Sequence, residues 1–182
     1  YFDVGGVVIK DFSGTNKWED LKHELGIPED KSQEFEDIYD RYQDEINTTR
    51  EIDSLLPIYK EKFGITLPDN YSFLVDGFVK RFEKNSDILS VIEIAKSKYK
   101  IGLLTNMYPK MLFEIKEKGL LPNIEFDQII DSSVEKVQKP YKEIYELVEK
   151  RCGFKGNEIL FIDNSQKHLD SAKQLGWQIF LY

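Results

Sequence analysis

Short apolar segments alternate with amphipathic stretches through the second half of the chain, and this alternation limits the possible folds more than any other feature. Each apolar run suits a strand, and each amphipathic stretch repeats its apolar residues at helical spacing. Strands that alternate with helices of this length form a parallel sheet with helices on both faces. The expected strands are 101–105, 126–130, 159–163 and 178–182, and the expected helices are 88–97, 110–118, 141–151 and 166–175.

The opening segment, Tyr1–Val8, supplies a further strand and a turn at Gly5-Gly6. Asp3 follows only two residues that can belong to this strand, and a central strand is usually longer. We therefore expect that native residues precede Tyr1.

The region between this strand and the alternating half contains no convincing strand. Turn signals divide it into expected helices at 17–25, 31–45, 50–63 and 71–82, and Pro57 predicts a kink or a boundary near Ser54. The sequence thus predicts an α/β, Rossmann-like parallel-sheet core made of residues 1–15 and 85–182. An all-helical subdomain, residues 16–84, is inserted after the first strand.

Composition and charge narrow the possible partners. A formal net charge of −8 disfavours nucleic acid and acidic membrane surfaces, which are polyanions. Cys152 is the only cysteine, so an internal disulfide is excluded and a reducing compartment is favoured. No apolar run approaches the roughly 18 residues that a membrane span needs. We expect a cytoplasmic protein, and its oligomeric state stays open.

Polar residues at the carboxyl ends of the expected strands are the candidates for chemistry, because open parallel sheets bind ligands at that edge. They are Asp3, Thr105 with Asn106, and Asp163, and Lys139 precedes a helix nearby. Taken singly, Thr105 or Asn106 suits a helix N-cap, Asp163 a turn and Lys139 a solvated loop. Together they offer a nucleophile, hydrogen-bond donors, a cation and a metal anchor, which phosphoryl transfer requires.

Four segments then carry a family resemblance. Asp3-Val4-Gly5-Gly6-Val7-Val8 resembles the first motif of the haloacid dehalogenase superfamily, Asp-x-Asp-Gly-Thr/Val. Leu103-Leu104-Thr105-Asn106 is similar to the second motif, Lys139-Pro140 to the third, and Phe161-Ile162-Asp163-Asn164 to the fourth. The motifs occur in the family's order, and the helical insertion stands where the family has a helical cap that closes over the site and selects substrate.

The resemblance implies a role for each matched residue. Asp3 would attack phosphorus and form an aspartyl-phosphate, while Thr105 and Asn106 would hydrogen-bond phosphoryl oxygens. Lys139 would offset charge on the nucleophile and on the transferring group. A Mg²⁺ cofactor would be held by Asp3, the backbone carbonyl of Gly5, and Asp163 with Asn164, because a carboxylate and a phosphate dianion repel each other without a cation.

Two positions depart from the family pattern. Gly5 stands where the family has a second aspartate that protonates the leaving oxygen and later activates water, help that is worth roughly 10²–10⁴ in rate. Asn164 stands where many members carry an acidic metal ligand, so Mg²⁺ affinity is expected to fall. The resemblance is therefore to a helical-cap phosphatase branch with Asp-x-Gly in its first motif.

Some polar residues are left without a firm role. His168, one turn into the last helix, is a candidate to lend a proton, but the expectation is a solvated surface histidine. In the insertion, the polar residues suited to reach a sugar or an acid are His23, Arg41, Tyr42 and Arg50.

Three functions remain open on the sequence. The favoured one is a Mg²⁺-dependent phosphatase for a small phosphorylated metabolite, with a sugar phosphate as one candidate. The second is a non-catalytic or weakly active relative that binds a ligand or partner, suggested by Gly5 and Asn164. The third is a 2-haloacid dehalogenase, a branch that also lacks the second aspartate and uses no metal.

Overall fold

The strands and the first residues of the chain form a parallel sheet. The computed structural model describes residues 1–182. β3 (Gly102–Thr105) pairs with β4 (Gln128–Asp131), and β5 (Leu160–Asp163) pairs with β6 (Gln178–Leu181). Each predicted strand in this half is confirmed with bounds within two residues.

The opening residues Tyr1–Asp3 lie between β3 and β5 and join the two strand pairs. On one side the Phe2 amide donates to the Gly102 carbonyl at 2.9 Å, and on the other the Asp3 amide donates to the Ile162 carbonyl at 2.8 Å. The spatial order is therefore β4, β3, Tyr1–Asp3, β5, β6. This order places Asp3 at the carboxyl end of the middle strand.

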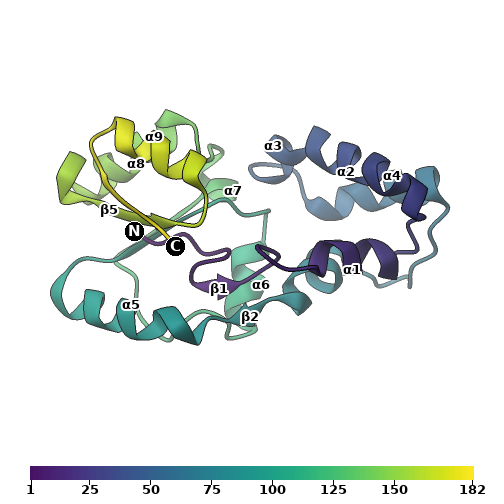
Figure 1. Cartoon of the computed structure of the whole chain (residues 1–182), viewed down its shortest axis with the longest axis horizontal. Helices are drawn as coiled ribbons and strands as arrows, with labels where there is room; N and C mark the ends of the chain where they lie inside the picture. Colours follow the sequence, from purple (N-terminus) through teal and green to yellow (C-terminus); the bar gives the residue numbers. More distant parts are fainter.

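Helices cover both faces of the sheet, as predicted, and the buried apolar residues form one cluster on each face. Figure 1 shows α8 (Lys142–Cys152) and α9 (Gln166–Gln174) on one side of the strands and α5 (Ser86–Lys98) on the other. Leu104 belongs to the apolar cluster of α8 and α9, while Leu103 belongs to the cluster of α5. Neighbouring residues of a strand point to opposite faces, so this split follows from the pleat. The short helix α7 (Ser132–Glu135) follows β4, and α6 (Met111–Glu117) follows β3.

The chain between β1 (Ile9–Lys10) and β2 (Glu83–Lys84) is mostly helical and lies to one side of the sheet in Figure 1. It contains α1 (Lys17–Glu24), α2 (Ser32–Arg41), α3 (Gln43–Ile46) and α4 (Leu56–Phe63), with a 3₁₀ turn η1 (Glu29–Lys31) before α2. Its two ends meet in an antiparallel ribbon, because β1 (Ile9–Lys10) pairs with β2 (Glu83–Lys84). Apolar residues of these helices share one buried cluster with the α5 face of the sheet.

The helix expected over 31–45 is wrong in one respect, because it is two helices. Tyr42, with φ −102° and ψ 4°, ends α2 and precedes α3. Its ring carries the guanidinium of Arg50 4.0 Å from the ring centre, and Arg50 also pairs with Glu45 at 3.2 Å. Of the two expectations from Pro57, the boundary near Ser54 is confirmed, since a 3₁₀ turn η2 (Ile52–Leu55) precedes α4 and Pro57 lies in the first turn of α4.

The helix expected over 71–82 is not an α-helix. The chain forms a π-helical segment η3 (Phe73–Phe78) and then a 3₁₀ turn η4 (Val79–Arg81). The Asp53 carboxylate accepts from the Leu74 amide at 2.7 Å and the Asp76 carboxylate accepts from the Ser72 amide at 2.8 Å. These side chains cap amides at the start of the segment, which any helix leaves without an intrahelical partner, so they fix where the segment begins.

No helix of the chain is both long enough and apolar enough to cross a bilayer.

Candidate active site

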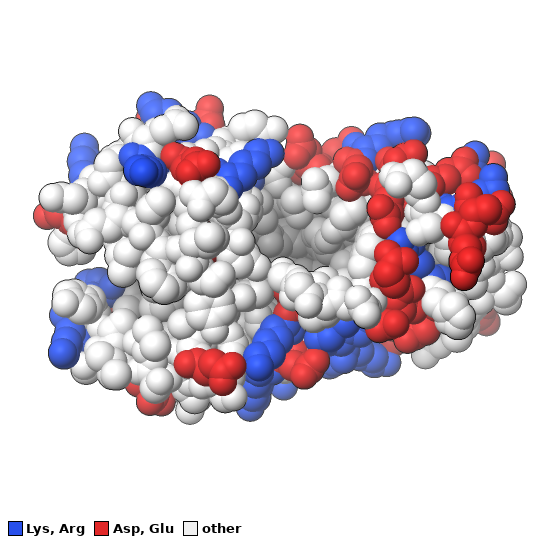
Figure 2. Space-filling model, in the orientation of Figure 1, with Lys and Arg blue, Asp and Glu red and all other residues white.

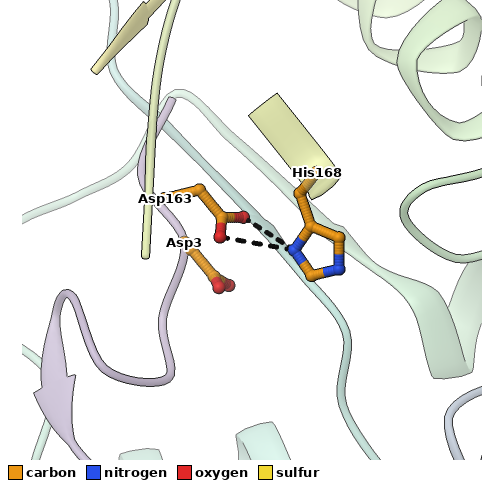
Figure 3. A group of neighbouring side chains, drawn as sticks. All are labelled: Asp3, Asp163 and His168. Carbon is orange, nitrogen blue, oxygen red and sulfur yellow. Dashed lines mark hydrogen bonds and ion pairs between the residues drawn. The ribbon is translucent and has the colours of Figure 1, made fainter. Parts of the chain in front are cut away.

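Three of the predicted site residues lie at the carboxyl ends of adjacent strands. Asp3 ends the middle strand, Thr105 is the last residue of β3, and Asp163 is the last residue of β5. Asp3 and Asp163 are brought together by this topology, with carboxylate oxygens in one cluster with a ring nitrogen of His168. Figure 3 shows the two carboxylates side by side, with His168 approaching Asp163 from α9.

Lys139 connects the two carboxylates. Its ammonium lies 2.9 Å from Asp3 Oδ1 and 2.7 Å from Asp163 Oδ2, and its side chain is fully buried. A buried cation between two buried anions compensates both, whereas a solvated loop lysine would reach neither. Lys139 is therefore not a solvated loop lysine, because its side chain is buried between the two carboxylates.

Asn106 holds the backbone of Lys139 in place. Its side-chain amide donates to the Lys139 carbonyl and its side-chain oxygen accepts from the Lys139 amide, both at 2.9 Å. This pair of hydrogen bonds engages both ends of the Asn106 side chain. Asn106 thus lies at the predicted site, and in this structure its side chain positions Lys139.

The two aspartates differ in their electrostatics. Burial works against ionisation of Asp163, but His168 and Lys139 outweigh it and hold the pKa of Asp163 at about 2. For Asp3, burial dominates and raises the pKa despite the pull of Lys139. Asp163 is therefore the fixed anion of the pair, and the charge of Asp3 responds more readily to an added cation.

His168 is not the solvated surface histidine that the sequence suggested. Its Nδ1 lies 3.1 Å from Asp163 Oδ2 and 3.3 Å from Oδ1, and its side chain is only 20% exposed. The sequence could have signalled this, because His168 lies in the first turn of α9 directly after the strand end at Asp163. In that first turn a side chain can reach back toward the strand end.

Thr105 is buried with its hydroxyl unsatisfied. Its Oγ1 has no hydrogen-bond partner in the protein, and the residue is fully buried. A buried hydroxyl without a partner costs roughly 1–3 kcal/mol. A bound ligand that forms a hydrogen bond with the Thr105 hydroxyl would remove this cost. An oxygen of a bound phosphoryl group is a partner of the right chemistry.

The turn after Asp3 brings Gly5, Gly6 and Asn164 together. Gly6 has φ +71°, and a Cβ placed there would lie 2.0 Å from the side-chain nitrogen of Asn164. Asn164 therefore packs against the backbone of the loop whose Gly5 carbonyl is a predicted metal ligand. Only glycine allows both the left-handed backbone and this close approach.

Gly6→Ala should therefore cost more stability than its backbone conformation alone explains. The matched control is Gly119→Ala, because Gly119 has φ +64° and nothing within 4 Å of its Cβ position. We expect about 1 kcal/mol for Gly119→Ala and a clearly larger loss for Gly6→Ala, measured by urea unfolding. Equal losses would show that Asn164 yields freely and does not fix the loop.

A cavity of about 280 Å³ opens beside these residues, between the sheet and the helical insertion. In Figure 2 a hollow with uncharged atoms on its floor separates the two parts of the molecule. Of its 13 lining residues, nine are hydrophobic, and Asp11 is the only carboxylate. The lining residues are Gly5, Ile9, Asp11, Phe12, Trp18, Tyr39, Asn47, Phe78, Phe82, Asn106, Met107, Tyr108 and Met111.

The insertion contributes to the cavity through residues that the sequence did not single out. Trp18, Tyr39, Asn47 and Phe78 line it, and the Tyr39 hydroxyl contacts the hydroxyl of Tyr108 from the sheet side. The four polar residues that we expected to reach the substrate do not line the cavity. His23 and Arg41 are exposed, and Tyr42 and Arg50 stack on each other elsewhere.

Comparisons with known proteins agree with this fold. The family of haloacid dehalogenase-like hydrolases has a model that matches residues 2–176. A HAD family enzyme from Bacteroides thetaiotaomicron superimposes with a TM-score of 0.81 at 18% identity, over 99% of this chain and 90% of that one. A complex of that enzyme with magnesium and inorganic phosphate gives 0.74 at 19% identity, over 99% and 91%.

A dehalogenase also shares the fold. The L-2-haloacid dehalogenase from Xanthobacter autotrophicus with chloropropionic acid covalently bound gives a TM-score of 0.64 at 20% identity, over 98% of this chain and 74% of that one. At such identities these likenesses show the fold alone. No curated protein matches the sequence.

Proposed function

Because this chain belongs to the haloacid dehalogenase-like hydrolase family, we propose that it is a Mg²⁺-dependent phosphatase. Its substrate would be the phosphate monoester of a small neutral alcohol, hydrolysed through an aspartyl-phosphate on Asp3. Residues 16–84 would act as the cap that covers the leaving group. The observation that carries the proposal is the buried Asp3–Lys139–Asp163 cluster beside an unsatisfied Thr105 hydroxyl.

Each member of this cluster suits one part of the reaction. Asp3 Oδ1 accepts from the Val4 amide at 2.7 Å and pairs with Lys139, which leaves Oδ2 as the oxygen for attack on phosphorus. Lys139 stabilises negative charge on the nucleophile and on the transferring group. The Thr105 hydroxyl would donate to a phosphoryl oxygen, where a positioned donor lowers the barrier.

The donor set fits Mg²⁺. Two buried carboxylates stand together at one edge of the sheet, and hard oxygen donors are what Mg²⁺ prefers. Asp3, Asp163, the Gly5 carbonyl and the Asn164 side-chain oxygen would hold the ion, and it would neutralise the phosphate that approaches Asp3. His168 offers nitrogen, a poorer ligand for this ion, and its contact with Asp163 suits a residue that orients the carboxylate.

The cavity favours an uncharged leaving group. It presents aromatic and methionine side chains and no lysine or arginine, so a second anionic group of the substrate would have no cation to pair with there. Aryl and sugar phosphates satisfy this requirement, since aromatic rings pack against flat or weakly polar ring faces. Substrates with a second phosphate or a carboxylate do not.

The test is turnover of a panel of phosphate monoesters with and without Mg²⁺. We expect Mg²⁺-dependent release of phosphate, with phosphate monoesters of neutral ring alcohols favoured roughly tenfold or more in kcat/KM over analogues that carry a second anionic group, such as phosphoglycolate. Halide release from 2-chloropropionate without phosphatase activity would identify a dehalogenase instead. Absence of both activities would favour the non-catalytic alternative.

Asn164→Asp should tighten Mg²⁺ binding, because it replaces a neutral oxygen by a charged one beside the Gly5–Gly6 loop. We expect roughly a tenfold lower Kd by calorimetry. Asn157→Asp, the same change at an exposed position of the 3₁₀ turn η5 (Gly156–Glu158), is the control. Equal Kd values for Asn164→Asp and the parent would remove Asn164 from the proposed metal ligands.

A further inference from the structure

Phosphate-ester hydrolysis needs a proton for the leaving oxygen, and the residues assigned so far do not supply it. Gly5 has no side chain, Lys139 is committed to two carboxylates, and His168 contacts Asp163 and does not line the cavity. The two tyrosine hydroxyls in the cavity bond to each other. The proton donor must therefore be sought among the remaining polar groups of the cavity.

Asp11 is the one acidic side chain in the cavity, and it lies directly over Gly5. Its Oδ2 is 2.6 Å, and its Cγ 3.5 Å, from the place where a Cβ on Gly5 would stand. That oxygen lies at about the distance that separates an aspartate's own Cβ from its carboxylate oxygens. Asp11 therefore presents a carboxylate oxygen about as close to the Cβ position of residue 5, two residues from Asp3, as a carboxyl group carried by that residue would be.

The backbone explains how Asp11 arrives there. The chain turns sharply after Asp3, with the Val7 and Ile9 amides both donating to the Val4 carbonyl, and then runs back through β1. Asp11 follows β1 directly, and β1 is anchored by its pairing with β2. A side chain at position 5 would overlap the Asp11 carboxylate and require it to move, so the missing side chain of Gly5 leaves the room that Asp11 occupies.

The Asp11 carboxylate is fixed at one oxygen and free at the other. Oδ1 accepts from the Ser13 amide at 2.8 Å, whereas Oδ2 accepts no hydrogen bond from the protein. The residue is partly buried at the cavity wall. This arrangement holds the group in position and leaves one oxygen available to a substrate.

We propose that Asp11 is a catalytic residue that donates the proton to the leaving oxygen and then takes one from the attacking water. In the first step Asp3 Oδ2 bonds to phosphorus, the bond from phosphorus to the ester oxygen breaks, and that oxygen takes the Asp11 proton and leaves as the alcohol. In the second step water attacks phosphorus while Asp11 takes its proton, and the bond to Asp3 breaks. Phosphate leaves and both aspartates are restored. This assignment rests on the proposed phosphatase function.

The decisive measurement is kcat/KM for aryl phosphates whose leaving groups span a range of pKa. Because kcat/KM covers the steps up to departure of the alcohol, it isolates proton donation from the later hydrolysis. We expect a shallow dependence in the parent and a steep one in Asp11→Asn and Asp11→Ala. The loss for alkyl phosphates should be roughly 10²–10⁴-fold, while acetyl phosphate, whose leaving group needs no proton, should lose little.

Controls separate the possible failures. Asp20→Asn, the same change at an exposed position of α1, should leave both slope and rate unchanged. The double variant Gly5→Asp/Asp11→Ala relocates the carboxyl group and should restore a shallow slope, whereas Gly5→Asp alone is crowded by Asp11. Phosphorylated Asp3 should accumulate in Asp11→Asn supplied with acetyl phosphate, because its hydrolysis lacks a base.

An unchanged slope in Asp11→Asn and Asp11→Ala, with parent turnover intact, would overturn the role of Asp11 and leave the phosphatase function standing. If the parent neither hydrolyses any phosphate ester nor forms a phosphorylated Asp3, the proposed function itself fails.

Discussion

Replacing Lys139 by methionine is expected to destabilise the protein by about 3–5 kcal/mol and to abolish turnover, because it leaves two buried carboxylates without their shared cation. The Lys139 and Asp163 side chains are fully buried and that of Asp3 is 10% exposed. Water therefore cannot solvate the two carboxylates once their cation is lost. Urea unfolding measures the stability and phosphate release measures the activity.

Two companion variants test the cause. Lys139→Met combined with Asp3→Asn should recover part of the lost stability, because only one buried carboxylate then remains uncompensated. Lys142→Met removes an exposed lysine that pairs with Glu146 and should change stability by less than about 1 kcal/mol. If Lys139→Met were as stable as the parent, the buried cluster would not be an electrostatic unit.

Asp3→Asn is expected to lower kcat by about 10⁴-fold or more, since an amide cannot form the acyl-phosphate. The fold should survive, because the side-chain oxygen can still accept from the Val4 amide and from Lys139. Phosphate release and thermal unfolding are measured together, and beryllium fluoride bound at Asp3 is the positive counterpart in the parent.

The matched control for this variant is Asp69→Asn, in an exposed loop of the helical insertion. It should keep parental activity. Near-normal turnover by Asp3→Asn, free of contaminating phosphatase, would mean that another residue is the nucleophile.

The sequence predicted the sheet half of the fold well because periodicity is strong there. Apolar runs such as 101–105 are buried on both faces, and their following helices carry clear amphipathic spacing, so each local pattern agrees with its environment. The insertion was predicted less well. Tyr42, at the break, contacts Arg50, and the π-helical segment after Ser72 begins with an amide bonded to Asp53, and neither partner lies within one helical turn in the sequence.

The site divides in the same way. Asp3, Thr105 and Asp163 were predictable because strand ends of a parallel sheet converge at one edge, whatever the details of packing. The position of Asp11 was not, because it depends on how sharply the chain turns after Asp3 and where β1 then pairs. The contact of His168 with Asp163 likewise depends on the orientation of α9 relative to β5.

The place of Tyr1–Asp3 in the middle of the sheet has a consequence for how the protein is made. This strand leaves the ribosome before both of its neighbours, β3 and β5, and the hydrogen-bond partner of the Asp3 amide is Ile162. Pairing between such distant segments is slow, because a long loop must close before any contact forms. Asp3 therefore lacks one of its two neighbouring strands until synthesis has passed β5, and a nascent chain that stops short of Ile162 lacks the carbonyl that accepts from the Asp3 amide.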